Sequence, residues 1–169
     1  MKKAKRAVGK TRSQIGALPI RWSALGEPEV LLVTTRTTRR WIVPKGWVIK
    51  GMKDNDAAAV EAREEAGVIG RIHKKSFGHY VYWKRMADHF VLCKVTLYVL
   101  ESKRRLEHWQ ETSQRHSHWF KLADAADLVE EPGLKAVIRK LKARLERSGP
   151  PLLAPPERPE SVIGTPTLQ

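Results

Sequence analysis

The apolar positions of the chain recur with two different spacings, and these predict its helices and strands. Continuous or alternating apolar runs of strand length are followed by turn residues such as Gly26 and Pro28. Stretches with apolar residues three and four positions apart predict helices. The predicted strands cover residues 13–22, 30–36, 41–44, 68–78, 79–85, 89–101 and 118–120, and the predicted helices cover 54–66, 121–129 and 132–147.

Individual residues sharpen this prediction. Pro19 has no N–H group to donate, which favours an edge strand or a bulge for the first strand. The run 89–101 is long and mostly apolar, so we expect it at the centre of a sheet. Gly67 can end the first helix as a C-cap, and Pro132 suits the first turn of the last helix. The polar stretch 102–117 predicts a surface loop, as do residues 45–51.

The order of these elements predicts an α+β fold with a mixed sheet packed between helices. A length of 169 residues fits one domain with a hydrophobic core of its own. We expect a basic N-terminal arm at residues 1–12, the folded domain at 13–148 and a flexible proline-rich tail at 149–169.

The formal net charge of +14 indicates a polyanionic partner or substrate, with a generally basic surface as the alternative. Nucleic acid is one such polyanion, although the chain carries no recognisable nucleic-acid-binding motif. Cys93 is the only cysteine, which excludes an intramolecular disulfide and a cysteine-rich zinc site. There is no apolar run of the ~20 residues that would span a bilayer, and we expect a cytoplasmic protein. Oligomeric state is left open.

The predicted helix at 54–66 carries three carboxylates in five residues. Glu61, Glu64 and Glu65 fall within an arc of about 100°, since a helix turns about 100° per residue. Four alanines, at positions 58, 59, 62 and 66, fall together on a neighbouring arc and can pack closely against a sheet. Like charges side by side destabilise an isolated helix, and a hard divalent cation such as Mg²⁺ would remove that cost. The alternative is a solvated acidic face.

The glycine, glutamate and aliphatic positions of this stretch resemble the Nudix box. The box reads Gly, five residues, Glu, seven residues, then Arg-Glu-aliphatic-any-Glu-Glu-any-Gly-aliphatic, and the matching residues here are Gly46, Glu61, Glu64, Glu65, Gly67 and Val68. The segments WIVPKG, RHSHWF and ADLVEEPGLKAVI are similar to those of the bacterial and diphosphoinositol polyphosphate branch of the Nudix family. The similarity covers roughly residues 13–147.

This resemblance implies a Nudix fold, in which a mixed sheet is sandwiched between helices, and a Mg²⁺-dependent pyrophosphohydrolase, with Mn²⁺ as an alternative ion. Its substrate would be phosphate-rich: a nucleoside diphosphate linked to another group, a dinucleoside polyphosphate or a diphosphoinositol polyphosphate. By the resemblance, Glu61 and Glu65 are the first choice as metal ligands, and Glu64 is a third ligand or the general base. The Gly46 carbonyl would be a further ligand.

Other residues enlarge the expected site. A second carboxylate from outside the helix is common in the family, and Glu107 or Glu111 could supply it, with a solvent-facing role as the alternative. Arginine and lysine suit phosphate binding, and four of them lead into the box. These candidate substrate-binding residues are Arg36, Arg39, Arg40 and Lys45. Trp47, in the same segment, could stack on a base. Histidines 108, 116 and 118 are weak evidence for a metal site.

Two positions depart from the box. Met52 stands where the box has its first glutamate, and Val60 stands where it has arginine. On a helical wheel, position 60 lies about 40° from Glu64, so an arginine there could orient that carboxylate. Arg63 lies about 100° from Glu64 and cannot simply substitute. The departures raise an alternative function: a weakly active or inactive Nudix-fold module that binds a phosphate ligand or regulates.

Overall fold

The computed structural model describes residues 10–150, so that residues 1–9 of the predicted arm and 151–169 of the predicted tail lie outside the described residues. The elements within residues 10–150 are eight strands and three helices. In chain order they are β1 (Arg12–Trp22), β2 (Pro28–Thr34), β3 (Trp41–Ile42), β4 (Lys45–Trp47), α1 (Asp54–Ala66), β5 (Val68–Ile72), β6 (Gly78–Arg85), β7 (Phe90–Arg105), β8 (Ser117–Lys121), α2 (Leu122–Leu128) and α3 (Pro132–Ser148).

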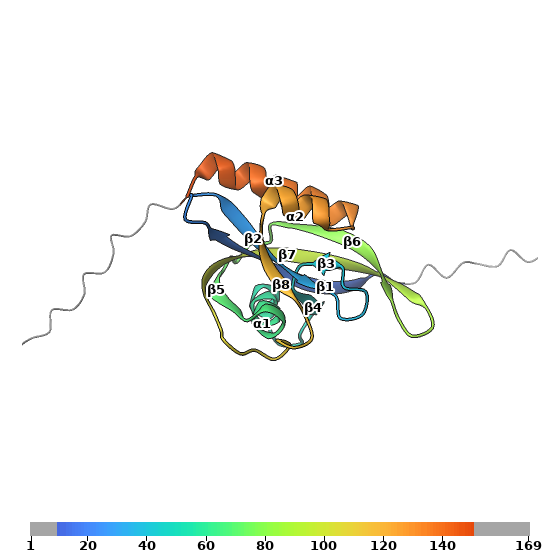
Figure 1. Ribbon diagram of the computed structural model, residues 1–169. Coiled ribbons are helices and arrows are strands. Elements are labelled where there is room, and N and C mark those ends of the chain that lie inside the picture. Colours follow the sequence, from blue (N-terminus) through green and yellow to red (C-terminus); the bar gives the residue numbers. More distant parts are fainter. Residues whose placement is uncertain (1–9, 151–169) are drawn as a thin grey trace, which may run out of the picture.

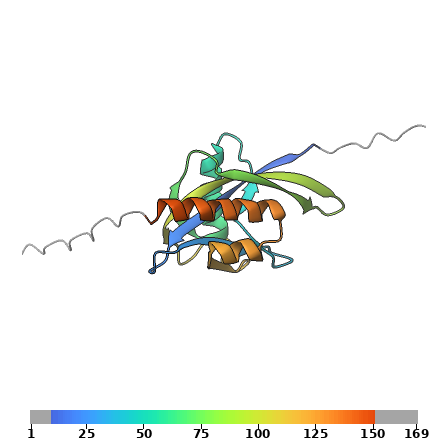
Figure 2. The ribbon, with the colours of Figure 1, turned by 90° about the horizontal axis from the view of Figure 1, so that it is seen from above.

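The strands form one mixed sheet between two helical layers, which confirms the predicted fold class. Figure 1 shows α1 against one face of the sheet and α2 with α3 against the other. Figure 2 shows α3 lying across the sheet with α2 beside it. Alternate side chains of β1 enter the two cores, because successive residues of a strand point to opposite faces. Leu18 and Ile20 pack with α2 and α3, whereas Ile15 and Ala17 pack with the alanines of α1.

Strand β7 lies at the centre of the sheet, as predicted. It pairs in parallel with β1 on one side, and antiparallel with β5 and β6 on the other. Strand β1 in turn pairs with β2 and β4, and β2 pairs with β3 and β8. None of the helices in residues 10–150 has the length and apolar character needed to cross a membrane.

Pro19 does not mark a sheet edge, because β1 has partners on both sides. Towards β4 and β2, Gln14–Gly16 pair with β4 and Ile20–Trp22 pair with β2. The N–H of Ala17 donates to the Pro44 carbonyl on that side at 3.0 Å. Residue 19 points the same way as residue 17, so the missing N–H of Pro19 faces the gap between the two partners. The sheet therefore loses no hydrogen bond there.

Several predicted boundaries were wrong. The strand predicted for 68–78 ends at Ile72. Strand β7 runs on to Arg105, because its pairing with β5 takes four residues from the predicted loop. The loop predicted for 45–51 begins instead with β4, whose three residues pair with β1. Strand β2 ends at Thr34, two residues before the prediction.

Helix α1 packs on the sheet through small side chains, as predicted, although the buried set differs by one residue. Ala57 is buried, and Ala59 is only partly so. The residues that are fully buried on this face are Ala57, Ala58, Ala62 and Ala66. Gly67 ends the helix in the left-handed conformation, with φ of 64°, as expected of a glycine C-cap.

Candidate active site

The three glutamates of α1 lie beside strand β4 and the loop that joins β7 to β8. Glu65 is buried, with 6% of its surface exposed, and Glu61 and Glu64 are half-buried. The alternative interpretation, a solvated acidic face, is therefore wrong for Glu65. A carboxylate withdrawn from water needs partners, and the surrounding elements supply them.

Gly46 in β4 lies directly against Glu61. Its antiparallel pairing with Ile15 holds the main chain there. A Cβ atom at residue 46 would overlap the Glu61 carboxylate, with even the farther oxygen, Oε2, only 2.8 Å away. The glycine of the predicted box thus allows a close approach between main chain and carboxylate.

Glu65 is held by a main-chain donor and a buried cation. Its Oε2 accepts the Lys45 N–H at 3.2 Å, and its Oε1 accepts Arg115 Nη2 at 3.2 Å. Burial raises the pKa of Glu65 to about 7, an effect that the charge of Arg115 opposes and that Glu61 reinforces. Burial, followed by the charges of Glu64 and Glu111, raises the pKa of Glu61 to about 6.

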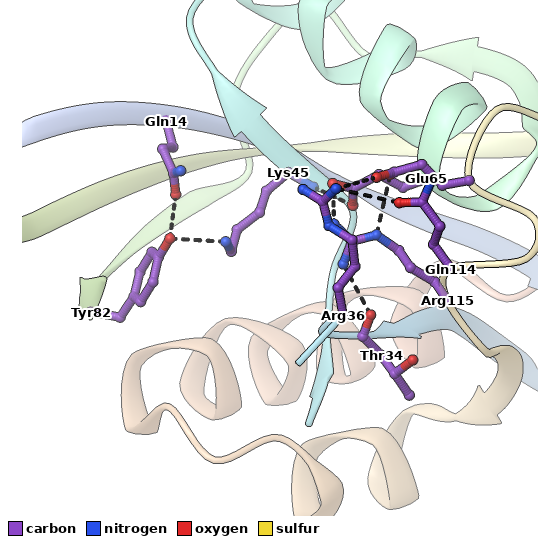
Figure 3. Close-up of polar contacts among 9 residues, drawn as sticks. Gln14, Thr34, Arg36, Lys45, Glu65, Tyr82, Gln114 and Arg115 are labelled. Atoms are coloured by element: carbon purple, nitrogen blue, oxygen red, sulfur yellow. Dashed lines mark hydrogen bonds and ion pairs between the residues drawn. The ribbon is translucent and has the colours of Figure 1, made fainter. Parts of the chain in front are cut away.

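Arg115 was not among the predicted site residues. Its side chain is only 8% exposed and donates to three groups: Glu65 at 3.2 Å, Glu111 Oε2 at 3.2 Å and the Thr34 carbonyl at 3.0 Å. Figure 3 shows it among Glu65, Thr34 and Gln114. The sequence held one signal, the four-residue spacing of Glu111 and Arg115, which we had placed in a surface loop.

The loop at residues 106–116 is packed against the end of α1, so the predicted surface loop is only partly correct. The N–H of Leu106 donates to Gly67 O at 2.8 Å, and the N–H of Glu111 donates to Glu64 O at 3.0 Å. The indole of Trp109 covers Gly67, where a Cβ would come within 2.5 Å of the ring. These contacts place Glu111 and Arg115 beside the glutamates of α1.

Of the two candidate carboxylates in the polar stretch, only one lies at the site. The side chain of Glu111 is 12% exposed and acts on the pKa of both Glu61 and Glu65. Glu107 is exposed. Glu111 is therefore the fourth carboxylate of this group.

Of the predicted basic residues, Lys45 contacts the carboxylate of Glu65 through its main-chain N–H. Its side chain points to the α3 face, where Nζ donates to Tyr82 Oη at 2.9 Å and Tyr82 donates to Gln14 Oε1 at 2.7 Å (Figure 3). Burial, followed by the charge of Lys84, lowers the pKa of Lys45 to about 8. Lys45 thus links the two faces, with its main chain at Glu65 and its ammonium at Tyr82.

The structure does not bring the three predicted arginines to one place. Arg36 reaches the site, with Nη1 3.6 Å from Glu111 Oε1 and 3.3 Å from Gln114 Oε1. Arg40 instead pairs with Glu130 and Glu131 at the start of α3, at 3.3 Å each. The third, Arg39, is exposed in the turn before β3, with φ of 55°.

The remaining candidates are placed as follows. Trp47 is partly buried, and the Arg12 guanidinium lies 4.1 Å from its ring centroid. Met52 is 39% exposed. Val60 lines a hollow of about 380 Å³ together with Glu64 and Trp109, so the box position that normally carries arginine is filled by an aliphatic group.

The donor chemistry of this group fits a hard divalent cation. Four carboxylates and the main chain of Gly46 offer oxygen ligands. Burial raises the pKa of two of these carboxylates, and a bound cation would offset the cost of keeping them charged. As they stand, no three His, Cys, Asp or Glu side chains among residues 10–150 are gathered closely enough to hold a metal ion. Binding would therefore require at least some of these carboxylates to move towards the others.

Comparison with known proteins places these features in a family. The sequence model of the NUDIX domain matches residues 13–143. Nudix hydrolase 16, mitochondrial, of Arabidopsis thaliana is 32% identical over 111 residues, which are 63% of this chain and 61% of that protein. Diphosphoinositol polyphosphate phosphohydrolase 2 of Rattus norvegicus is 36% identical over 107 residues, 62% of this chain and 56% of that protein. Diphosphoinositol polyphosphate phosphohydrolase 3-beta of Bos taurus is 33% identical over 121 residues, 69% of this chain and 70% of that protein.

The first two of these relatives are matched over less than two thirds of their own length. Solved structures share the fold. An Ap4A hydrolase binary complex of C. elegans has a TM-score of 0.62 at 24% identity, covering 81% of this chain and 99% of that one. The NUDIX domain of Shewanella oneidensis NrtR, complexed with ADP ribose, has a TM-score of 0.62 at 17% identity, covering 85% of this chain and 94% of that one.

Proposed function

Because this chain belongs to the Nudix family, we propose that it is a divalent-metal-dependent pyrophosphohydrolase that cleaves a diphosphate linkage in a phosphate-rich small molecule. The observation that carries the proposal is the contact of Gly46 with Glu61, next to the buried Glu65. A solvated acidic helix would need neither the glycine nor the burial. Both features bring carboxylate oxygens close to a main-chain carbonyl, which is the kind of ligand set that a hard cation binds.

The proposed roles follow from position. Glu61 and Glu65, one helical turn apart, would hold Mg²⁺ or Mn²⁺ together with the Gly46 carbonyl. When bound, the ion would neutralise charge on the phosphate oxygens and make bound water a better nucleophile. Glu64 and Glu111 are the candidates for a further ligand or for the general base that takes the proton from water.

The substrate would enter from the side where the basic residues lie. Arg36 lies 3.6 Å from Glu111, and the main chain of Lys45 contacts Glu65, and we propose that these two side chains bind its phosphates. Arg39 is exposed and could also contact a phosphate. Arg40 could do so only after its ion pairs with Glu130 and Glu131 break. Relatives named as diphosphoinositol polyphosphate phosphohydrolases, and a structural neighbour named as an Ap4A hydrolase, favour substrates with several phosphates.

A hollow of about 350 Å³ beside Tyr82 is our candidate for the non-phosphate group of the substrate. Trp83 and Arg40 contribute to its lining, as does Glu131. Glu131, which helps to line this hollow, has a buried Oε2 without a hydrogen-bond partner among residues 10–150. Buried polar atoms without partners cost stability, so a ligand or water that satisfies them is favoured there.

The test is an assay of phosphate release from a panel of compounds. The panel contains a diphosphoinositol polyphosphate, Ap4A, ADP-ribose and nucleoside triphosphates, each with Mg²⁺, with Mn²⁺ and with a chelator. We expect metal-dependent turnover on at least one compound, reduced by roughly 100-fold or more in Glu64→Gln and Glu65→Gln. Glu146→Gln is the matched control, since Glu146 is exposed on α3 and pairs with Lys142. The absence of metal-dependent turnover on the whole panel would reject the enzyme proposal.

The second candidate is a phosphate-binding or regulatory module without efficient catalysis. Met52 and Val60 favour it, because they replace the glutamate and the arginine of the box. The Arg115–Glu65 ion pair also favours it, because it occupies a carboxylate that would otherwise be open to a metal ion. Calorimetric titration with the same compounds separates the two candidates. Saturable binding without turnover would support the module. The cytoplasmic location remains our sequence-based prediction.

A further inference from the structure

We propose that Arg115 is a positioning residue, which holds Glu65 and Glu111 in fixed orientations at the site and so supplies an orienting cation from the loop in a chain whose position 60 is valine. This inference rests on the proposed function and concerns the same site. It accounts for how a chain with Val60 can keep its buried carboxylates in place.

The guanidinium of Arg115 is used in three directions. Nη2 donates to Glu65 Oε1 at 3.2 Å, Nε donates to Glu111 Oε2 at 3.2 Å, and Nη1 donates to the Thr34 carbonyl at 3.0 Å. Its planar donors are rigid relative to one another, so the two carboxylates are fixed relative to each other and to β2. With only 8% of its side chain exposed, this arginine is not an ordinary surface cation.

The main chain around Arg115 is also fixed. The next residue, His116, pairs with Thr34 in both directions: its N–H donates to Thr34 Oγ1 at 3.0 Å, and its carbonyl accepts the Thr34 N–H at 2.9 Å. On the other side, the Glu111 N–H binds the carbonyl of Glu64. Arg115 is therefore held between β2 and α1, and it fixes the carboxylates relative to the sheet.

A cation at position 60 would reach the carboxylates from a different direction. Position 60 lies about 40° from Glu64 but about 140° from Glu65 on the helical wheel. Val60 accordingly lines the hollow beside Glu64 and Trp109, away from the Arg115 contacts. The structure thus assigns Glu65 and Glu111 to the loop arginine.

A competing role for Arg115 predicts the opposite effect on metal affinity. If Arg115 were only a counter-ion that occupies the place of a metal, its removal would free the carboxylates and subtract a positive charge, so cations would bind more tightly. If Arg115 positions the carboxylates, its removal weakens cation binding even though a repelling charge is gone. The sign of the change separates the two roles.

The experiment measures Mn²⁺ binding by electron paramagnetic resonance, together with kcat and KM, for the full-length wild-type protein and three variants. Arg115→Ala is expected to bind Mn²⁺ about 10–100-fold more weakly and to lose about the same factor in kcat, as is typical when an outer partner of a ligand is removed. Arg115→Lys is expected to fall between, because lysine supplies the charge without the planar set of donors. Arg21→Ala is the matched control, since Arg21 forms its 2.7 Å pair with Glu29 at the other end of β1.

Three results would overturn the inference: tighter Mn²⁺ binding by Arg115→Ala, unchanged binding and kcat, or full wild-type values for Arg115→Lys. Circular dichroism identifies a variant that fails to fold, and Arg115→Lys then carries the test. A wild-type protein that neither binds Mn²⁺ nor turns over any substrate would instead reject the proposed function, so the two failures are distinguishable.

Discussion

The main chain of Gly46 and the carboxylate of Glu61 are in such close contact that a Cβ at residue 46 would displace the carboxylate. The two residues come from different elements, β4 and α1, and are 15 positions apart. The orientation of the Glu61 carboxylate therefore depends on the position of β4. Small changes on either side should therefore appear in activity before they appear in stability.

Gly46→Ala is expected to displace Glu61 and to lower kcat by about 10-fold or more, since small misplacements of catalytic groups are costly. The change in melting temperature should be small, because Glu61 is half-buried and can move. Gly78→Ala is the control, since a Cβ there meets Val137 at an ordinary 3.4 Å. Equal kcat values for Gly46→Ala and the wild type would contradict the proposed ligand role of Glu61.

The metal-free protein should lose stability as the pH rises from about 4.5 to about 7. The pKa of Glu65 is raised in the folded state from 4.5 to about 7, so the folded state binds more protons than the unfolded state in this window. The free energy of unfolding therefore falls with pH there, on the order of 3 kcal/mol from this group. Denaturant unfolding at pH 5 and pH 8, compared between wild type and Glu65→Gln, measures the effect. A pH dependence of equal size in the variant would assign it to other groups.

Lys45→Met is expected to make the protein more stable and a poorer enzyme. The lowered pKa of Lys45, about 8, means that at pH 7 the folded state carries a buried charge at a cost. Removal of that charge should raise the free energy of unfolding at pH 7 by roughly 1–3 kcal/mol. Loss of a phosphate contact should raise KM about 10-fold or more. Thermal melts and steady-state kinetics check the two signs, and an unchanged KM would remove Lys45 from the proposed phosphate site.

Trp109→Ala should loosen the loop at residues 106–116 from the end of α1. The ring covers Gly67 and carries the Arg105 guanidinium 4.9 Å from its centroid. We expect a loss of about 2–3 kcal/mol in the free energy of unfolding, below the range of a fully buried tryptophan. Hydrogen exchange should increase at the Leu106 and Glu111 amides, which donate to Gly67 and Glu64. Unchanged exchange at both amides would show that the loop is anchored elsewhere.

Val60→Arg is expected to raise kcat by less than about threefold, because Arg115 already orients Glu65 and Glu111 and position 60 serves only Glu64. The measurement is steady-state turnover on whichever panel substrate is active. An increase of tenfold or more would show that the missing box cation limits the wild-type enzyme.

The elements whose signal is local were predictable from the sequence. The apolar runs of β1, β2 and β7 predicted strands, and Gly67 predicted the end of α1 through its left-handed conformation. The three glutamates were also found, because their spacing on one helix is a local property. Their roles remain predictions.

Features that depend on pairing across the chain were not predictable in this way. Strand β4 forms only because Gln14–Gly16 are available beside it, and the last four residues of β7 extend only because β5 pairs with them. Arg115 is 50 positions from Glu65, and nothing in its neighbours indicates burial. The burial of an arginine in a polar loop cannot be predicted from the loop's own sequence when its carboxylate partner lies in a distant helix.

The exchange of partners at Pro19 has a consequence for how this chain can be altered. One half of β1 carries β2, and the other half carries β4 with Gly46, so each partner keeps its own register. Between these two partners, residues 36–39 are exposed, whereas Ile42 and Val43 are buried in the two cores. Substitutions at residues 36–39 can therefore change the basic surface beside the site while the hydrophobic layers on both faces of the sheet stay as they are.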